Sequence, residues 1–270
     1  MTNPIVTLLS DFGLKDPYVA EMKAVIIGIC PKASIVDLSH QIEKFNIRMG
    51  AFVLASASPY FPKGTIHVGV VDPGVGTKRR PILVETRHSF YVGPDNGLLM
   101  LAAKKQGINH AYDITNRHYM LSHISKTFHG RDIFAPAAAH LALGLNPADF
   151  GPEIHNYAIP RFAEPQLSEN ELRGEVIHID DFGNVILNLS AEDLAKAPIE
   201  IGSAIKLRFK NEKAIVLRFC STYGEEQLGK PLVLIGSHNF LEISVNQADA
   251  SKKFGTKAGD AVSIMPVDSP

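Results

Sequence analysis

The sequence has little of several residue types and patterns, and each shortage excludes a class of protein. It contains only two cysteines, Cys30 and Cys220, too few for a disulfide scaffold and typical of a reducing compartment such as the cytoplasm. No apolar run approaches the roughly 20 residues of a membrane-spanning helix, and no basic and then apolar N-terminal segment indicates a signal peptide. The formal net charge of −1 lacks the basic excess of a nucleic-acid-binding protein.

Common motifs for metals, phosphates and nucleophilic serine are also missing from the sequence. The 11 histidines include no His-x-x-x-His pair, and the cysteines are not paired, so no metal site is expected. There is no Walker loop, no Gly-x-Gly-x-x-Gly and no Gly-x-Ser-x-Gly elbow. What is present, 270 residues with 45% hydrophobic and 20% charged side chains, fits one large or two small globular domains.

The first 160 residues alternate between strand and helix patterns. Apolar runs predict strands at residues 5–9, 35–38, 66–71, 82–84 and 90–92. Helical spacing predicts helices at residues 18–29, 47–60, 98–105 and 133–143, the first opened by Asp16 as N-cap and by Pro17. Because strands alternate with helices, we expect a mostly parallel sheet that is covered on both faces.

The pattern changes after a polar, Pro-rich segment at residues 160–172, which predicts a linker. Short strand patterns follow at residues 174–179, 184–189, 204–209, 214–219, 232–235, 241–245 and 261–264, with one short helix at residues 190–196 capped by Ser190 and Asp193. The predicted fold class is α/β. It combines an N-terminal, mostly parallel α/β sandwich domain at residues 1–165 with a C-terminal antiparallel β-barrel domain at residues 172–270.

The loop at residues 71–80, Val-Asp-Pro-Gly-Val-Gly-Thr-Lys-Arg-Arg, is the most informative segment of the chain. It places the carboxylate of Asp72 directly after a buried strand, with Arg79 close by. Asp11 follows the first strand in the same way. Because ligands bind outside the carboxyl ends of parallel strands, we expect both carboxylates to face one crevice. Structural interpretations remain open: a turn or cap for Asp11, and a loop-stabilising salt bridge between Asp72 and Arg79.

Four further polar segments are candidates for a site, at residues 93–97, 127–132, 180–184 and 236–247. In the second of them, Thr-Phe-His-Gly-Arg-Asp, His129 could titrate near neutral pH. There Gly130 is expected to leave open space and Asp132 to cap a helix. Taken alone, each segment is also explained as a turn, a cap or a structural histidine.

Taken together and in order, these segments resemble the S-adenosylmethionine (SAM) hydrolases, also called SAM hydroxide adenosyltransferases, relatives of fluorinase and chlorinase. The similarity extends from Leu-Leu-Ser-Asp-Phe-Gly at residues 8–13 to Gly-Ser-His-Asn-Phe-Leu-Glu-Ile-Ser-Val-Asn at residues 236–246. It implies hydrolysis of SAM to adenosine and L-methionine without a cofactor or metal. It also implies a homotrimer whose small-molecule substrate lies between the N-terminal domain of one subunit and the C-terminal domain of the next, with no nucleic-acid or membrane partner.

The resemblance also implies a role for individual residues. Asp72, Arg79 and His129 match the family's catalytic set, which handles the attacking water. Asp11 would hold the ribose hydroxyls, and Asp180 would hold the methionine ammonium. The remaining implied contacts are the pocket walls Phe45 and Phe128, the adenine contacts Phe182, Asn184 and the backbone near Gln247, and the carboxylate contacts Ser237 and His238.

One position distinguishes the hydrolases from their halogenating relatives. Those relatives have tyrosine where this chain has Asp72, and a carboxylate there repels a halide and favours water. The fluorinase insertion after the third strand is missing, and His238 stands where the halogenases have arginine. Three alternatives stay open: a SAM-dependent halide transferase that forms 5′-halo-adenosine, a non-catalytic SAM or adenosine sensor, and a purely structural trimeric protein.

Overall fold

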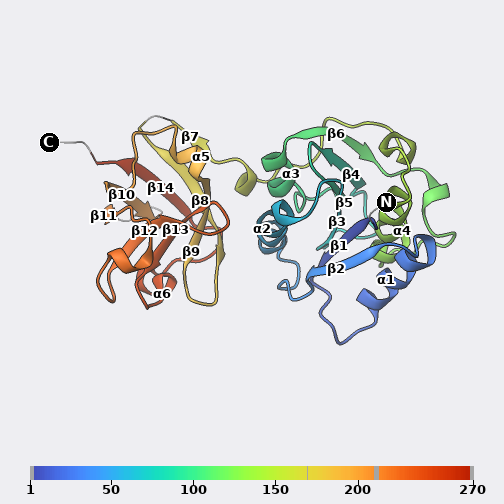
Figure 1. Cartoon of the computed structure of the whole chain (residues 1–270), viewed down its shortest axis with the longest axis horizontal. Coiled ribbons are helices and arrows are strands. Elements are labelled where there is room, and N and C mark those ends of the chain that lie inside the picture. Colours follow the sequence, from blue (N-terminus) through green and yellow to red (C-terminus); the bar gives the residue numbers. More distant parts are fainter. Residues whose placement is uncertain (1–2, 169, 210–212, 268–270) are drawn as a thin grey trace. The chain divides into compact units, whose positions relative to one another are not determined.

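The computed structural model describes residues 3–168, 170–209 and 213–267, and its chain divides into two compact units (Figure 1). The first unit is Met1–Pro160 and the second is Arg161–Pro270. Each unit has its own hydrophobic core, because the buried residues of one core come from the first unit and those of the other from the second. The division falls at Pro160, where the predicted linker begins.

The first unit is built on a six-stranded sheet in the order β2-β1-β3-β5-β4-β6. Its strands are β1 (Ile5–Ser10), β2 (Ser34–Ser39), β3 (Ile66–Val70), β4 (Pro81–Thr86), β5 (Phe90–Pro94) and β6 (Ile108–Asp113). β1 pairs in parallel with β2 and β3, and β3 pairs in parallel with β5. β4 runs antiparallel to β5 and β6. The parallel strands therefore bring the ends of β1 and β3 to the same edge.

Helices cover both faces of this sheet (Figure 1). They are α1 (Tyr18–Ile29), α2 (Ile47–Ala57), α3 (Met100–Gln106) and α4 (Ala135–Ala142), with shorter 3₁₀ turns at Ser58–Tyr60, Arg117–Tyr119 and Pro147–Phe150. α1 packs on α4, and α2 packs on α3. None of the helices in the described ranges combines the length and the apolar character that a membrane crossing requires.

Two details of the helices differ from the sequence prediction. Asp16 is not the N-cap of α1: Pro17 occupies that position, and no side chain caps the helix. The helix predicted at residues 133–143 is preceded by a π-helical turn, Gly130–Phe134. Such turns often occur at functional sites.

The second unit is an eight-stranded antiparallel sheet that nearly closes into a barrel. Its strands are β7 (Gln166–Leu167), β8 (Leu172–Ile179), β9 (Val185–Ser190), β10 (Ala204–Phe209), β11 (Ile215–Arg218), β12 (Pro231–Ile235), β13 (Phe240–Val245) and β14 (Ala261–Pro266). A single bridge between Phe219 and Val233 links the two ends of the strand order. The predicted fold class, a parallel-rich α/β sandwich followed by an antiparallel barrel, is confirmed.

Three short helical segments complete the second unit: α5 (Ala191–Leu194), α6 (Ala250–Phe254) and a 3₁₀ turn at Tyr223–Glu225. The predicted capping box of Ser190 and Asp193 opens α5. The segment predicted as a linker is more ordered than a linker, because it contains a 3₁₀ turn, Arg161–Ala163, and β7, which pairs with β8. Its Glu169 lies outside the described residues.

A buried histidine, His67 of β3, predicts how the first unit responds to acid. The side chain is fully buried, its Nδ1 lies 2.8 Å from Thr7 Oγ1, and its ring stacks on Tyr91 with centroids 5.0 Å apart. Burial is the main cause that lowers the pKa of His67 to about 3. The folded protein therefore resists protonation of a group that the unfolded chain protonates near pH 6.5.

We expect His67 to make the protein acid-labile. Its contribution to stability is complete above about pH 6.5 and falls as the pH drops toward 3, by about 2 kcal/mol between pH 7.5 and 5. Urea unfolding at both pH values should show this loss in the wild type but not in His67→Asn. His110→Asn, which removes an exposed histidine, is the matched control. An equal loss in wild type and His67→Asn would contradict the assignment.

Candidate active site

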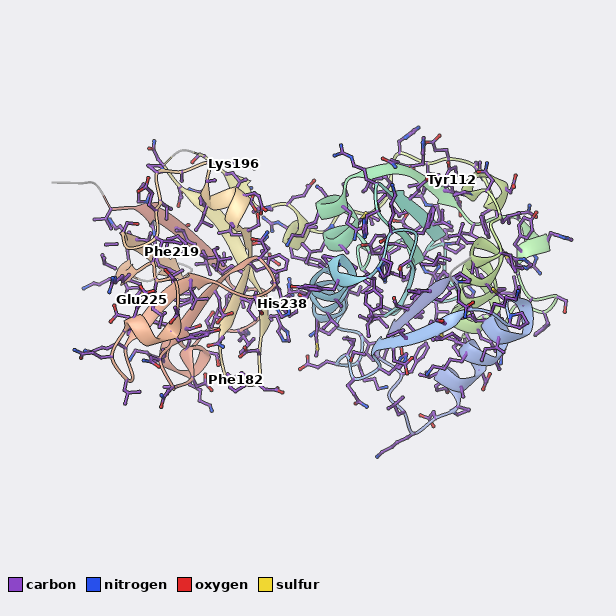
Figure 2. All side chains as sticks on the ribbon, viewed as in Figure 1. Tyr112, Phe182, Lys196, Phe219, Glu225 and His238 are labelled. Atoms are coloured by element: carbon purple, nitrogen blue, oxygen red, sulfur yellow. The ribbon has the colours of Figure 1, made fainter. Side chains whose placement is uncertain are left out.

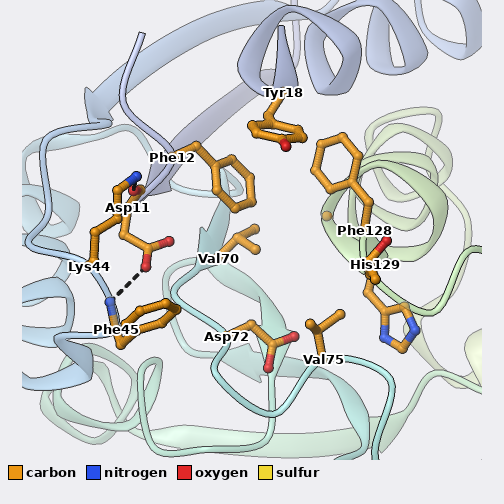
Figure 3. A pocket seen from close by; sticks show the side chains of 12 residues that line it. Asp11, Phe12, Tyr18, Lys44, Phe45, Val70, Asp72, Val75, Phe128 and His129 are labelled. Carbon is orange, nitrogen blue, oxygen red and sulfur yellow. Dashed lines mark hydrogen bonds between the residues drawn. The ribbon is translucent and has the colours of Figure 1, made fainter. Parts of the chain in front are cut away.

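A cavity of about 340 Å³ opens in the first unit at the edge where β1 and β3 end (Figure 3). Asp11 follows β1 directly, Asp72 follows β3 after one residue, and both line the cavity. The geometry expected from the strand ends is therefore present. Phe45, Phe128 and His129 line the same cavity. Its volume is in the range of pockets that hold small ligands.

Asp72, Arg79 and His129 form one hydrogen-bonded group at this cavity. Arg79 donates to both Asp72 oxygens, from Nε to Oδ1 at 3.1 Å and from Nη2 to Oδ2. Arg79 Nη2 also lies 3.1 Å from His129 Nδ1. The side chains of Asp72 and Arg79 are only 5% and 7% exposed. A buried bidentate ion pair thus lies against His129. The planar guanidinium of Arg79 makes two hydrogen bonds to the carboxylate of Asp72 and so fixes its orientation.

The backbone around Asp72 explains how these side chains meet. Gly76 has φ +74°, and a Cβ there would lie 2.2 Å from the carbonyl oxygen of Lys126. Only glycine allows this contact, which joins the Asp72 loop to the segment that carries His129. On the other side, Asn96 Nδ2 donates to the Val71 carbonyl at 2.8 Å. The turn at residues 93–97 therefore supports the Asp72 loop and is more than a plain connection.

The hydrogen bonds assign the protonation of His129. Arg79 has only donors, so His129 Nδ1 must accept, and a neutral ring then carries its hydrogen on Nε2. Burial and the charge of Arg79 lower the pKa of His129, against the opposing charges of Asp72 and Asp132. The ring is therefore neutral at physiological pH and presents a donor on Nε2.

Residues 125–132 form a tight loop that positions His129. Asp132 is fully buried, accepts from Ser125 N at 2.8 Å, and is paired with Arg131 Nε at 2.7 Å. It closes this loop and does not cap the helix, contrary to the sequence prediction. Gly130 also differs from prediction: an added Cβ would lie 3.2 Å from both Met22 Sδ and Phe128 Cε2, so the position is crowded and not open.

Asp11 is held by the segment that carries Phe45. Asp11 is only 6% exposed, and its Oδ2 accepts from Phe45 N at 2.8 Å (Figure 3). Phe45 has φ +65°, a left-handed conformation that costs a bulky residue on the order of 1–3 kcal/mol. That conformation presents both the amide and the ring of Phe45 to the cavity, which is a strained arrangement typical of ligand sites.

Three aromatic rings form the opposite wall of the cavity (Figure 3). Phe12, Tyr18 and Phe128 contact one another with ring centroids 5.1 to 5.5 Å apart. No motif had indicated that Phe12, Tyr18 or Lys44 belongs to the site. All three line the cavity, and Lys44 also donates to the Asp11 carbonyl. Phe12 follows Asp11 in the sequence, and Lys44 precedes Phe45. Their position next to candidate site residues was the one feature of the sequence that could have indicated them.

The second unit carries the other predicted contacts on two turns. Asp180, Phe182 and Asn184 share the turn between β8 and β9. There Asp180 Oδ1 accepts from the backbone N of Phe182 at 3.0 Å and of Asn184 at 2.9 Å, and its Oδ2 accepts from Asn184 Nδ2 at 3.0 Å. Asp180 thus stabilises its turn, in agreement with the interpretation of residues 180–184 as a turn. Phe182 is 81% exposed, a large apolar surface for one residue (Figure 2).

Ser237 and His238 lie on the turn between β12 and β13, and both are exposed. His238 is labelled in Figure 2. Gln247 follows the far end of β13 and has a left-handed φ of +54°. A buried carboxylate that the sequence analysis missed, Glu242, lies against the first of these turns: a Cβ on Gly236 would be 2.6 Å from its Oε2. Glu242 Oε1 accepts from the Tyr223 hydroxyl at 2.7 Å.

Comparison with known proteins identifies the family. Residues 6–151 match the SAM hydroxide adenosyltransferase N-terminal domain, and residues 174–263 match its C-terminal domain. The chain is 39% identical to an (R)-S-adenosyl-L-methionine hydrolase of Methanocaldococcus jannaschii, over 97% of this chain and 95% of that protein. It is 28% identical to a fluorinase of an Actinoplanes species over 97% of both proteins.

A solved structure agrees with these matches. The crystal structure of an uncharacterized conserved protein from Thermotoga maritima aligns with a TM-score of 0.85 and 38% sequence identity, covering 96% of this chain and 99% of that one. The similarity therefore includes both units and the segments that carry Asp11, Asp72 and His129. The chain belongs to the SAM hydroxide adenosyltransferase family.

Proposed function

We propose that the protein hydrolyses SAM to adenosine and L-methionine by in-line attack of water on the ribose 5′-carbon. Similarity over nearly the full chain to proteins named SAM hydrolase supports the reaction. The observation that carries the proposal is the hydrogen-bonded group of Asp72, Arg79 and His129 beside a cavity that also contains Asp11. The sulfonium already makes methionine a good leaving group, so the protein must position and activate the water.

In this mechanism Asp72 accepts the proton of the water. Each Asp72 oxygen receives one bond from Arg79 and keeps a second lone pair for the water. His129 is unsuited to be the base, because its Nδ1 lone pair faces Arg79 and its Nε2 carries a hydrogen. His129 instead donates to the water oxygen and orients it. Arg79 balances the charge of Asp72 and fixes its direction.

Positioning supplies the larger share of the rate. A well-aligned reactant pair can gain about 7–11 kcal/mol over free reactants in water. A general base adds about 10²- to 10⁴-fold. The rings of Phe12, Tyr18 and Phe128 can attract the sulfonium through their faces. That attraction speeds the reaction only to the extent that it strengthens toward the transition state.

We propose that the complete substrate site forms between subunits of a cytoplasmic homotrimer, with contacts from the first unit of one subunit and the second unit of the next. Asp11 binds the ribose diol between the walls Phe45 and Phe128. Contacts from the second unit would be Asp180 for the ammonium, Ser237 and His238 for the carboxylate, and Phe182, Asn184 and the backbone at Gln247 for adenine. The exposure of Phe45, 69%, and of Phe182, 81%, supports a surface that a ligand and a neighbouring subunit cover.

Chromatography of a SAM incubation tests the function. We expect adenosine and methionine in equal amounts, and no 5′-chloroadenosine when chloride is added, because Asp72 repels a halide. A halogenated product would favour the transferase alternative. Thermal stabilisation by SAM without any product would favour the sensor.

Asp11→Asn should weaken nucleoside binding more than it slows the chemical step. A charged acceptor for the ribose diol is lost, and such hydrogen bonds change affinity by roughly tenfold or more. Calorimetric titration with adenosine measures the effect directly. Asp16→Asn, which changes an exposed carboxylate of the same loop between β1 and α1, is the matched control. Unchanged adenosine affinity in Asp11→Asn would remove this residue from the ribose site.

A further inference from the structure

A series of serine, histidine and aspartate begins at Ser10, the residue before Asp11; its serine and histidine are buried and its aspartate, Asp37, is exposed at the surface. Ser10 Oγ is 2.7 Å from His40 Nδ1, and His40 Nε2 is 3.1 Å from Asp37 Oδ1. Asp37 Oδ2 in turn accepts from Lys23 Nζ at 2.6 Å. Ser10 ends β1 and Asp37 belongs to β2, so the series crosses two neighbouring parallel strands.

The direction of each hydrogen bond in this series follows from its neighbours. The amide of Phe12 donates to Ser10 Oγ at 3.3 Å, which uses one lone pair of the hydroxyl and leaves its hydrogen available to His40. The Asp37 carboxylate can only accept, so the His40 Nε2 that faces it carries a hydrogen, and in the tautomer with that single hydrogen Nδ1 accepts from the Ser10 hydroxyl. The distance from Nε2 to Asp37 Oδ1 is short, but the two groups are poorly aligned for a hydrogen bond. Within the described residues Nε2 has no well-aligned acceptor.

These residue types can make a nucleophile, but Ser10 is not one. Its side chain is fully buried and the ring of His40 is 2% exposed, so no substrate reaches the hydroxyl. Because Ser10 cannot contact a substrate, its hydrogen bond with His40 has a structural role. The series must therefore act through what it holds in place.

It holds the loop that carries Asp11. The His40 side chain is hydrogen-bonded to Ser10, and the His40 carbonyl accepts from Gly13 N at 2.8 Å. A single residue therefore holds the chain on both sides of the Asp11–Phe12 pair. The same segment then continues to Phe45, whose amide binds Asp11 Oδ2 at 2.8 Å. His40 thus anchors the Asp11 loop and also the start of the segment that orients the Asp11 carboxylate.

We propose that His40 is a positioning residue for nucleoside recognition, which it controls by fixing the Asp11 carboxylate for a ribose diol. The inference rests on the proposed function only for the identity of the ligand. His40 and Ser10 touch no substrate, and Asp72 lies on a different loop of the cavity, the one that follows β3. Loss of His40 should therefore weaken binding and leave the chemical step nearly intact.

The test compares His40→Leu, His40→Asn and Ser10→Ala in the full-length protein. We expect His40→Leu and Ser10→Ala to raise the dissociation constant of adenosine, and KM for SAM, by about tenfold, with kcat within about threefold of wild type. His40→Asn should recover part of the affinity, because its amide oxygen can still accept from Ser10. Tyr91→Phe, which removes another buried hydrogen bond of the unit, to Ser58, controls for general loosening and should change neither constant.

A double-mutant comparison with Asp11→Asn shows whether His40 acts through Asp11. If it does, His40→Leu adds little to the binding defect of Asp11→Asn, because the carboxylate that it orients is already gone. Additive effects, or unchanged adenosine affinity in both His40→Leu and Ser10→Ala, would overturn the proposal. Adenosine titration needs no turnover, so failure of SAM hydrolysis in the wild type would refute the proposed function without deciding this one.

Discussion

Asp72→Asn should lower kcat for adenosine formation by about 10³-fold, the largest effect expected of any single change. The amide keeps the shape of the carboxylate but cannot accept the proton of the attacking water. It also leaves the buried guanidinium of Arg79 without its anion, which disturbs the orientation of the new amide side chain. Single-turnover assays on SAM, with products separated by chromatography, measure the chemical step alone.

Asp95→Asn is the matched control for this substitution. Asp95 forms a similar pair with the adjacent arginine, from Arg80 Nη2 to Asp95 Oδ2 at 2.6 Å, but does not line the cavity. Its loss should affect stability and not kcat. Wild-type kcat in a folded Asp72→Asn protein would exclude Asp72 as the proton acceptor.

His129→Ala should lower kcat by about 10²-fold, and His129→Gln should recover about tenfold of that loss. The reason is the tautomer: the neutral ring offers Nε2–H to the water, and the glutamine amide can place a donor at a similar position. If His129 were the base, alanine and glutamine would be equally slow, because neither accepts a proton at neutral pH.

The same assignment predicts that protonation of His129 does not change kcat/KM near neutral pH. Because the pKa of His129 is lowered below its ordinary value, chiefly by burial and by Arg79, the ring is predominantly neutral above pH 6.5. We therefore expect kcat/KM to stay level over that range. A fall in kcat/KM centred near pH 6.5 or above, absent in His129→Gln, would contradict the neutral-donor role.

Elements with strong local signals could be predicted from the sequence. The apolar runs of β1 and β3 and the capping box at Ser190 are local features, and the structure shows all three. β6 was missed because its Ile-Asn-His-Ala-Tyr-Asp sequence alternates weakly and is stabilised by pairing with β4. α6 had a readable signal that was overlooked, with Asp249 as N-cap and Gly255 in a left-handed conformation after its end.

The candidate site was predictable only in part, and for a physical reason. Asp11 and Asp72 follow parallel strands, so the fold alone predicts that they face one cavity. The contact of Arg79 with His129 depends on Gly76 approaching the Lys126 carbonyl, which is a tertiary event. The left-handed Phe45 and the π-helical turn after His129 also arise from packing, so no sequence pattern indicated them.

Hydrolysis of SAM in oxygen-18 water, with mass spectrometry of both products, tests the central claim most directly. The account places one water beside Asp72, in line with the bond between the 5′-carbon and sulfur. It predicts one oxygen-18 in the 5′-hydroxyl of adenosine and none in methionine. Release of 5′-methylthioadenosine or free adenine, or label at any other carbon, would mean that water attacks elsewhere and would contradict the account.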